Sequence, residues 1–515
     1  MTITNVPLET IQRYIVPNLE LNDIINLISS TKYFYHNFTK SNNKDNIKSL
    51  SFVDQFWRDL CVKRWKSVSF DHSPLVNKNI SDYSNWFIEY QRRHRVDTEA
   101  KQLIESMVQL KIKGEDIQSS LMQWSKLMMN RKDIWDVMIG VAKEAQHLDI
   151  AGQEGKQRKR IIMELLEGTH RFHICQEFQQ LCAYERQLVS RDNEHFDQNN
   201  DNLHTLSLED GAILIAKFYQ NAKDMISDYD IAHGTYEYNN NDDDDLQTLE
   251  EYIHIQIDGL ANLIRKRLSE RHERERTSSY MSSSRIEYNN IHNEQWPMHW
   301  ILDEMKVLFD VKSEEEEQAV ETNDELTINS CFGKAIDTRP FVGNKENYYS
   351  HYNSLIHSVL NSRKGIPLTL SIIYAAITKR LSNVNVEPVG LPGHFMLSTQ
   401  INHPLQQQLE RVFIDAFEGG KIMTESNCKS LICSTYNIFW DEKFIEPVSM
   451  AEVWIRMLRN LVNSHRITQQ KYNEISVRVL MSFGYQDLDL NHEYRGSEYI
   501  VRILKFFYRF ESDLL

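Results

Sequence analysis

A turn, a histidine and an aspartate are the parts of this sequence whose types and spacing could support chemistry. Residues 365–367 (Gly-Ile-Pro) stand where a helix begins, because proline suits the first turn of a helix. His394 follows a Pro-Gly pair, and Asp415 follows the apolar run 412–414. In nucleophilic catalysis, a histidine activates a side chain at a helix start and an aspartate orients that histidine. The spacing therefore indicates the layout of a site for acyl transfer or peptide hydrolysis.

Short helices and strands must position these residues. The apolar positions within 368–377 predict a largely buried helix. Three short strands are expected at 384–389, 395–397 and 412–414. Gly365 is expected to allow an unusual backbone turn before the helix, and residues 419–420 (Gly-Gly) close a second turn.

The order of motifs in this region resembles the SirB-type transglutaminase-like family of bacterial regulators. The motifs are Arg-x-Gly-Ile-Pro at 363–367, Leu-Pro-Gly-His-Phe at 391–395, Ile-Asp-x-Phe-x-Gly-Gly at 414–420, and helical matches at 208–212 and 454–461. The resemblance spans about 205–515, with insertions. It implies a transglutaminase-like α+β domain with C-terminal helices.

Alignment to the Gly-x-Cys pattern of that family places Pro367 at the position of the nucleophile. Proline has no thiol, hydroxyl or N–H group, so the triad positions Pro367, His394 and Asp415 are expected to be catalytically degenerate. Other nucleophiles lie beyond the first helical turn or outside the motif, namely Thr369, Ser371, Cys428 and Cys433. We expect a groove that holds a peptide or degron instead of cutting it.

The first 65 residues carry a second pattern. Residues 6–9 (Val-Pro-Leu-Glu) open a run with helical spacing, and residues 57–60 (Trp-Arg-Asp-Leu) close the segment. These ends resemble an F-box whose centre at 30–32 is weakened. The resemblance implies a three-helix module that binds the Skp adaptor of a cullin–RING ubiquitin ligase. The residues expected to contact the adaptor are Pro7, Leu8, Ile11, Ile15, Leu19, Ile24, Leu27, Trp57 and Leu60.

An F-box followed by a SirB-type domain resembles the F-box-only protein 21 family. Members of that family usually end in a small barrel that resembles YccV. The sequence up to Leu515 is expected to lack that barrel.

Composition narrows the function classes. The chain has 515 residues and a net charge of −15, which argues against a nucleic-acid-binding surface because phosphate binding needs clustered Lys and Arg. No apolar stretch approaches the roughly 18 residues of a membrane span, and no secretory signal is visible. Six scattered cysteines without a C-x-x-C pair favour a reduced protein without structural zinc. We expect no metal, cofactor, nucleic acid or membrane, and a cytoplasmic or nuclear location.

Helical patterns dominate the middle of the chain. Residues 135–141 and 208–217 predict helices, and the second is expected to pair with a helix at 253–268. Gly168 is expected to end a helix. Residues 271–285, rich in Arg, Glu and Ser, are expected to form a solvated loop.

These patterns together predict a mostly α-helical α+β protein. The expected domains are a three-helix F-box at 1–65, a helical linker or substrate region at 66–204, and the transglutaminase-like domain at 205–515. The expected function is substrate recognition in a cullin–RING ubiquitin ligase, without catalysis by the chain itself. Two alternatives stay open. One is an active cysteine-protease- or transglutaminase-like hydrolase or acyltransferase that uses His394 with another nucleophile, and the other is a regulatory scaffold unrelated to ubiquitin.

Overall fold

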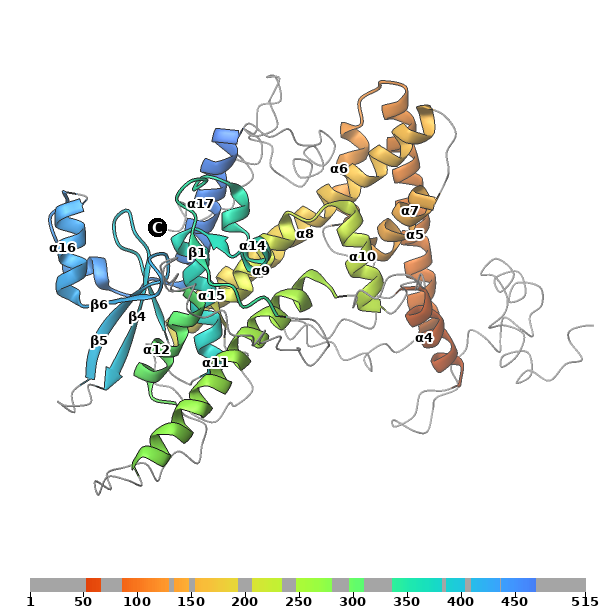
Figure 1. Ribbon diagram of the computed structural model, residues 1–515. Helices are drawn as coiled ribbons and strands as arrows, with labels where there is room; N and C mark the ends of the chain where they lie inside the picture. Colours follow the sequence, from red (N-terminus) through yellow and green to blue (C-terminus); the bar gives the residue numbers. More distant parts are fainter. Residues whose placement is uncertain are drawn as a thin grey trace, which may run out of the picture. The chain divides into compact units, whose positions relative to one another are not determined.

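The computed structural model describes residues 52–65, 86–128, 134–147, 153–192, 206–233, 247–279, 296–309, 336–381, 386–402, 409–435 and 437–468. These residues form a mostly helical α+β protein, which confirms the predicted fold class (Figure 1). The chain divides into two compact units, 1–162 and 163–515. The division falls within the long helix α8 (Gln153–Asp192).

All the described secondary-structure elements of the first unit are helices. Its helices are α4 (Phe52–Arg64), α5 (Trp86–Ile112), α6 (Gln118–Met128), α7 (Ile134–His147) and the start of α8. Helix α4 packs on α5, where the Trp57 ring lies 5.0 Å from the Tyr90 ring. Asp97 on α5 accepts hydrogen bonds from Arg64 and from the Trp65 indole, each at 2.9 Å. A buried carboxylate therefore fixes the end of α4 against α5, since a charge away from water must be paired.

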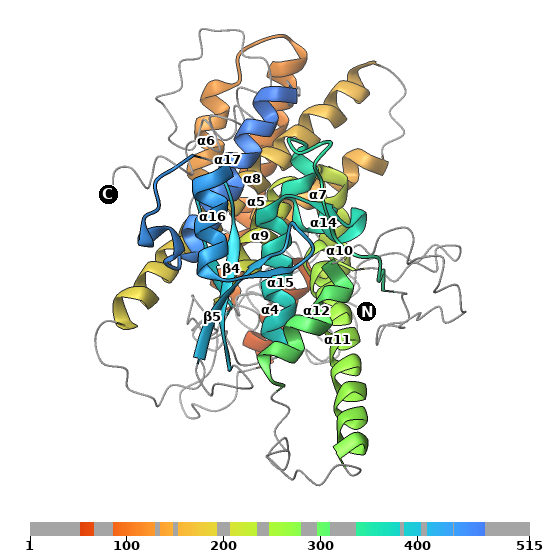
Figure 2. The same cartoon turned by 60° about the vertical axis from the view of Figure 1, so that its left-hand side comes forward.

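The second unit contains the remaining helices (Figure 2). They are α8 from Met163 onward, α9 (Leu208–Phe218), α10 (Ala222–His233), α11 (Leu249–Ser279), α12 (Met298–Phe309), the short 3₁₀ helix η7 (His351–Ser354), α14 (Ile356–Ser362), α15 (Pro367–Leu381), α16 (Glu425–Thr435), the 3₁₀ helix η8 (Glu442–Ile445) and α17 (Met450–Thr468). Helix α15 lies at the centre, because α9, α11, α14 and α17 all contact it. Its apolar side chains are almost fully buried, as the sequence predicts.

Two small sheets belong to the second unit. An antiparallel sheet has the order β3 (Glu387–Val389), β4 (Met396–Asn402), β5 (Leu409–Asp415) and β6 (Lys421–Met423). A parallel pair joins β1 (Val342–Gly343) to β2 (Lys364–Gly365), directly before α15. The three predicted strands correspond to β3, β4 and β5, although β4 and β5 run further along the chain.

The four-stranded sheet is buried on both faces. Successive side chains of a strand point to opposite faces. Met396 and Phe413 join a core cluster with Cys428 of α16. Leu397 and Ile414 alternate with them and are also fully buried. Since α12 and α15 contact β4 while α16 contacts β5 and β6, helices cover the sheet on both sides (Figure 1).

Helix α8 corrects one prediction. Gly168 does not end a helix, because α8 continues through it to Asp192. Glycine costs a helix interior about 1 kcal/mol. Beyond it, Phe172 and Phe178 are buried, and the Phe178 ring contacts Trp454 of α17 at 6.1 Å. Such burial contributes more than the glycine costs. The second unit thus includes residues 163–192, which the expected division assigned to the middle region.

Helix α11 corrects a second prediction, the loop expected at 271–285. Residues 271–279 are helical and not a loop, because α11 continues to Ser279. The charged side chains stabilise this end locally, since Arg271 pairs with Glu275 one turn later at 3.2 Å. Arg271 also lies 4.9 Å from the Trp300 ring centroid of α12. Among the described residues, no helix is both long and apolar enough to cross a membrane.

Candidate functional site

The structure brings His394 and Asp415 together. His394 stands just before β4, in a turn where its backbone N–H donates to Leu391 O at 3.1 Å. Asp415 is the last residue of β5, which pairs antiparallel with β4. The imidazole Nε2 lies 2.8 Å from Asp415 Oδ2. The predicted histidine–aspartate pair therefore forms between the turn before β4 and the end of the neighbouring strand β5.

The turn after β5 fixes the aspartate. Asp415 Oδ1 accepts from the backbone N–H groups of Phe417 and Glu418, both at 3.1 Å. Its side chain is almost completely buried, whereas the His394 side chain is 12% exposed. Because Nε2 donates to the carboxylate, the neutral ring presents Nδ1 as an acceptor. The described residues offer no hydrogen-bond partner to Nδ1, so it is available to a ligand.

Pro367 is the first residue of α15, as expected. The unusual backbone turn before the helix lies at Arg363 (φ 60°) and not at Gly365, which corrects the prediction for Gly365. Gly365 is required by packing instead, since a Cβ there would lie 2.9 Å from a methyl carbon of Val359. Arg363 is buried, with its guanidinium 4.5 Å from the Phe341 ring centroid.

Arg363 also has a charged partner, Asp337. The two side chains form an ion pair at 3.3 Å. Partial burial acts to raise the pKa of Asp337, but hydrogen bonds from Arg339 and the Arg363 charge outweigh it and lower the pKa to about 2. The ion pair fixes the chain just before β2 and thereby positions the start of α15.

A pair of asparagines connects this helix start to the rest of the site. Asn344 donates its backbone N–H to Gly365 O at 2.9 Å, and the Ile366 N–H donates to Asn353 O at 3.5 Å. The Asn344 side-chain amide donates to the Asn353 side-chain oxygen at 3.0 Å. Asparagine is common in turns, but only the fold shows that these two residues brace the segment before Pro367.

Phe417 completes the connection to the histidine–aspartate pair. A Cβ at Gly343 in β1 would lie 2.7 Å from the Phe417 ring. Since Gly343 pairs with Gly365 in β2, the turn that holds Asp415 packs beside the strand that leads into α15. Pro367 is therefore linked to the pair through β2, β1 and Phe417. Phe417 belongs to the motif at 414–420, but the sequence pattern does not indicate its contact with β1.

Three of the four other nucleophile candidates lie in buried surroundings. Thr369 and Ser371 on α15 are fully buried, and their hydroxyl groups have no hydrogen-bond partner among the described residues. Cys428 on α16 is also fully buried, and burial together with the nearby Asp415 charge raises the pKa of its thiol to about 11. A thiol with a raised pKa is a poor nucleophile near neutral pH. Cys433, also on α16, is exposed.

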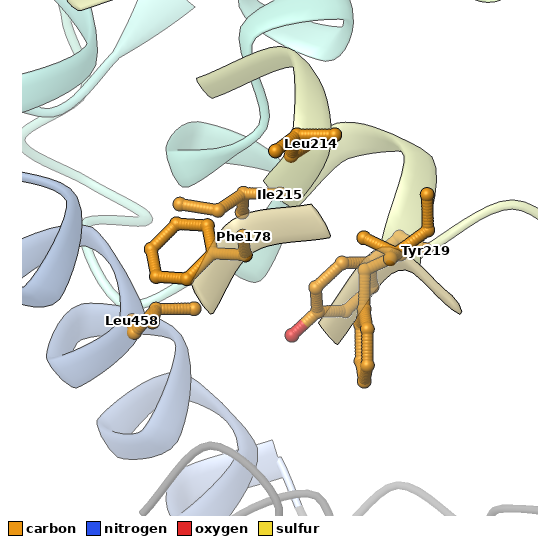
Figure 3. Close-up of a pocket in the computed structure, with 7 residues that line it drawn as sticks. Phe178, Leu214, Ile215, Tyr219 and Leu458 are labelled. Atoms are coloured by element: carbon orange, nitrogen blue, oxygen red, sulfur yellow. The ribbon is translucent and has the colours of Figure 1, made fainter. Parts of the chain in front are cut away.

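A small apolar pocket lies elsewhere in the second unit, between α8, α9 and α17 (Figure 3). Its lining residues are Ile174, Phe178, Leu214, Ile215, Phe218, Tyr219 and Leu458. Its empty space of about 230 Å³ includes open solvent and is smaller than the roughly 300–1,000 Å³ of small-molecule sites. The described residues also contain no cluster of His, Cys, Asp and Glu that could hold a metal ion.

Most residues predicted to contact an adaptor lie outside the described residues, namely Pro7, Leu8, Ile11, Ile15, Leu19, Ile24 and Leu27. The other two are on α4. Leu60 is half-buried, and Trp57 is 1% exposed, with its ring 4.9 Å from that of Phe87. In this structure Trp57 therefore packs within its own unit. Adaptor binding by these nine residues stays a prediction.

Comparison with known families assigns the site to a class of domain. Residues 301–459 match the model of the transglutaminase-like superfamily. This segment extends from α12 into α17 and contains Pro367, His394 and Asp415. The histidine–aspartate pair and the start of α15 are therefore parts of a transglutaminase-like domain.

Comparison with individual proteins gives the nearer relationship. F-box only protein 21 of Mus musculus is 36% identical over 98 residues, which cover 19% of this chain and 16% of the relative. The Homo sapiens protein is 37% identical over 98 residues, covering 19% and 15%. A UPF0162 protein of Xylella fastidiosa (strain 9a5c) is 23% identical over 126 residues, covering 24% and 42%. No solved structure matches. The chain is thus similar to F-box only protein 21 over 98 residues, and it spans less than a fifth of the length of that relative.

Proposed function

We propose that this chain is the substrate-recognition subunit of a cullin–RING ubiquitin ligase. Residues 1–65 bind the Skp adaptor, and the helical and transglutaminase-like regions bind the protein that is to be ubiquitinated. The homology to F-box only protein 21 is the observation that carries this proposal. The F-box-like residues at 6–9 and 57–60 support it independently.

The transglutaminase-like site supports a role in binding. Its helix begins with Pro367, which supplies no nucleophilic atom. Cys428 has a raised pKa and is buried, and the Thr369 and Ser371 hydroxyl groups are enclosed in the core. Nucleophilic catalysis requires an activated atom within reach of the reacting carbon. On this proposal the chain itself forms and breaks no bonds, and the ligase supplies the chemistry.

The pair His394–Asp415 has a use in such a binding site. The backbone N–H groups of Phe417 and Glu418 hold the Asp415 carboxylate, and the carboxylate orients the His394 ring and its Nδ1. A fixed acceptor can take a hydrogen bond from a backbone N–H of an extended peptide without a further ordering cost. We infer that the pair helps to hold the target peptide in register.

One observation favours a second candidate function, hydrolysis or acyl transfer. A general base needs an oriented imidazole with an available nitrogen, and His394 has both. That function would require a nucleophile that the described part of the site does not supply. The two candidates make different predictions about covalent labelling, because only the second forms an acyl-enzyme that depends on His394.

Affinity capture of the full chain from cells, with mass spectrometry of the captured proteins, tests the proposal. We expect the Skp adaptor and a cullin to be recovered in amounts comparable to the chain. Capture that lacks both would contradict the ligase assignment and favour a scaffold unrelated to ubiquitin.

A further inference from the structure

The surface beside the candidate site is aromatic and exposed. Tyr348, Tyr349 and Tyr352 expose 36%, 56% and 60% of their surface. The Tyr348 ring lies 5.3 Å from that of Tyr349 and 6.4 Å from that of Phe417. Single exposed apolar residues are common, but adjoining exposed rings such as those of Tyr348 and Tyr349 can form an interaction site. We call residues 344–352 the aromatic turn.

Hydrogen bonds with two asparagine side chains hold the backbone of the aromatic turn. The Asn347 backbone N–H donates to the Asn344 side-chain oxygen at 3.0 Å. Buried Asn353 donates its side-chain amide to Asn347 O at 2.6 Å and to Tyr348 O at 3.2 Å. Exposed aromatic side chains on a fixed backbone lose little entropy on binding, so they can contribute most of their contact energy to a complex.

The charges on this surface favour a basic partner. Lys345 Nζ lies 2.9 Å from Glu418 Oε1 and 5.9 Å from the Phe417 ring centroid. A cation of the chain itself therefore already occupies the face of this ring. Glu346 is exposed next to it and has no ion pair among the residues that the structure describes. With one Lys and two Glu side chains, the surface has an excess of negative charge.

We propose that the aromatic turn, together with Phe417 and Glu418, binds an arginine side chain of an extended peptide segment in the target protein. A guanidinium stacks on aromatic rings and donates to a carboxylate in one plane, which an ammonium does less well. In the free protein Lys345 holds this position through a pair of exposed charges that contributes little stability. An incoming arginine displaces it and pairs with Glu418, and Glu346 balances the added charge.

The proposal rests on the proposed function, because it names the peptide chemistry that the surface near His394 would select. The aromatic turn is hydrogen-bonded directly to the segment before Pro367, because the Asn344 N–H donates to Gly365 O at 2.9 Å. A peptide whose backbone contacts His394 would thus pass over the Phe417 turn, which packs on β1. The arginine site and the histidine–aspartate pair would then bind neighbouring residues of one ligand.

The test compares two peptides that differ in one charge. The full chain, labelled with 3-fluorotyrosine, is titrated with acetyl-Gly-Ala-Arg-Ala-Gly-amide and with the same peptide carrying citrulline. The fluorine resonances of Tyr348, Tyr349 and Tyr352 are assigned with single Tyr→Phe variants. We expect the arginine peptide to shift these resonances with an affinity about threefold to fivefold higher than that of the citrulline peptide. Equal affinities, or shifts confined to other tyrosines, would overturn the proposal.

Variants separate the arginine site from general attraction to an acidic protein. Tyr349→Ala and Glu346→Gln should each weaken binding of the arginine peptide about threefold, and Lys345→Gln should strengthen it by a similar factor, because the competing cation is gone. Glu442→Gln removes the same charge from exposed residues of η8 and is the matched control. A control that weakens binding as much as Glu346→Gln would refute the site.

The outcomes also separate this inference from the proposed function. A chain that captures the Skp adaptor but does not distinguish arginine from citrulline would leave the ligase role intact and reject the arginine site. A chain that makes the distinction but captures no adaptor would reject the ligase role and leave a peptide-binding surface. Thermal unfolding of each variant checks that its fold is unchanged, which is expected because the substituted side chains are exposed.

Discussion

His394 Nε2 lies 2.8 Å from Asp415 Oδ2, and Asp415 is itself fixed by two backbone N–H groups through its other oxygen. The imidazole is therefore oriented by a carboxylate that the following turn holds in place. The site thus combines the orienting part of a triad with Pro367 at the helix start.

Removing the carboxylate of Asp415 should destabilise the second unit. Asp415→Ala leaves the part-buried N–H groups of Phe417 and Glu418 without their acceptor, which should cost about 1 kcal/mol for each lost hydrogen bond. Asp415→Asn keeps one side-chain oxygen and should cost less than the alanine variant. Urea unfolding measures the difference. His394→Ala is the control, and a loss as large as that of Asp415→Ala would show that the turn does not depend on the carboxylate.

The thiols should react according to their burial. Iodoacetamide should modify exposed Cys433 on the folded chain well before buried Cys428, whose pKa is raised to about 11 by burial and by the Asp415 charge. The labelling of both should be unchanged in His394→Ala, because neither thiol is activated by the imidazole. Peptide mass spectrometry follows each site over time. Rapid labelling of Cys428 that disappears in His394→Ala would support the enzyme alternative.

The sequence predicts the site residues because local chemistry determines them. Proline at a helix start, His394 after a Pro-Gly turn and Asp415 at a strand end are all readable from neighbours along the chain. The sequence could not predict that Phe417 bridges the Asp415 turn to β1 or that Asn353 braces the aromatic turn. These contacts join segments far apart in the sequence, and no periodicity records them.

Two glycines in helices should respond to alanine in opposite directions. A Cβ at Gly211 of α9 would lie 2.3 Å from the ring of Trp454, which is fully buried and donates its indole N–H to Leu208 O. Gly211→Ala should therefore destabilise by about 1–3 kcal/mol through overpacking. Gly140 of α7 has nothing within 4 Å of such a Cβ, so Gly140→Ala should stabilise by about 0.5–1 kcal/mol.

Thermal unfolding measures both changes, and either sign can refute the packing argument. A stabilising Gly211→Ala would mean that Trp454 moves aside at little cost. A destabilising Gly140→Ala would mean that this face of α7 is more crowded than the structure shows.

Stability should fall in alkaline solution as His254 of α11 loses its proton. Its imidazole hydrogen-bonds to Glu209 of α9 at 2.9 Å, and this bond together with the nearby Glu250 carboxylate raises the pKa of His254 to about 10. Since an unfolded histidine has a pKa of about 6.5, this contribution is complete below that pH and is lost as the pH rises towards about 10. The side chain is 40% exposed, so solvent screening limits the contribution to about 1 kcal/mol.

The variant His254→Gln isolates the contribution of the His254 proton to the free energy of unfolding. The free energy of unfolding of the wild type should exceed that of the variant at about pH 6, and the difference should shrink steadily towards pH 10. Denaturant titrations at several pH values measure it. A difference that stays constant over this range would mean that the His254 proton is not coupled to folding.

The wrong predictions for α8 and α11 show which features cannot be predicted from neighbouring residues alone. Gly168 and the charged run 271–279 both look like helix ends when only neighbouring residues are considered. In the structure, buried aromatic residues after Gly168 continue α8, and the contact of Arg271 with Trp300 supports α11. Tertiary packing therefore decides element length in both cases, whereas intrinsic propensity decides it only for isolated helices.

Quantitative co-purification of the Skp adaptor tests the central claim most directly. The wild-type chain, Pro7→Glu, Ile11→Glu and the control Tyr349→Ala are expressed at equal levels, and the adaptor recovered per mole of chain is measured by mass spectrometry. A charge placed in an apolar helix-in-groove contact costs several kcal/mol, so recovery should fall about tenfold or more for the first two variants. The control should match the wild type. Equal recovery from all four chains, or no adaptor with the wild type, would contradict the assignment as a ligase substrate receptor.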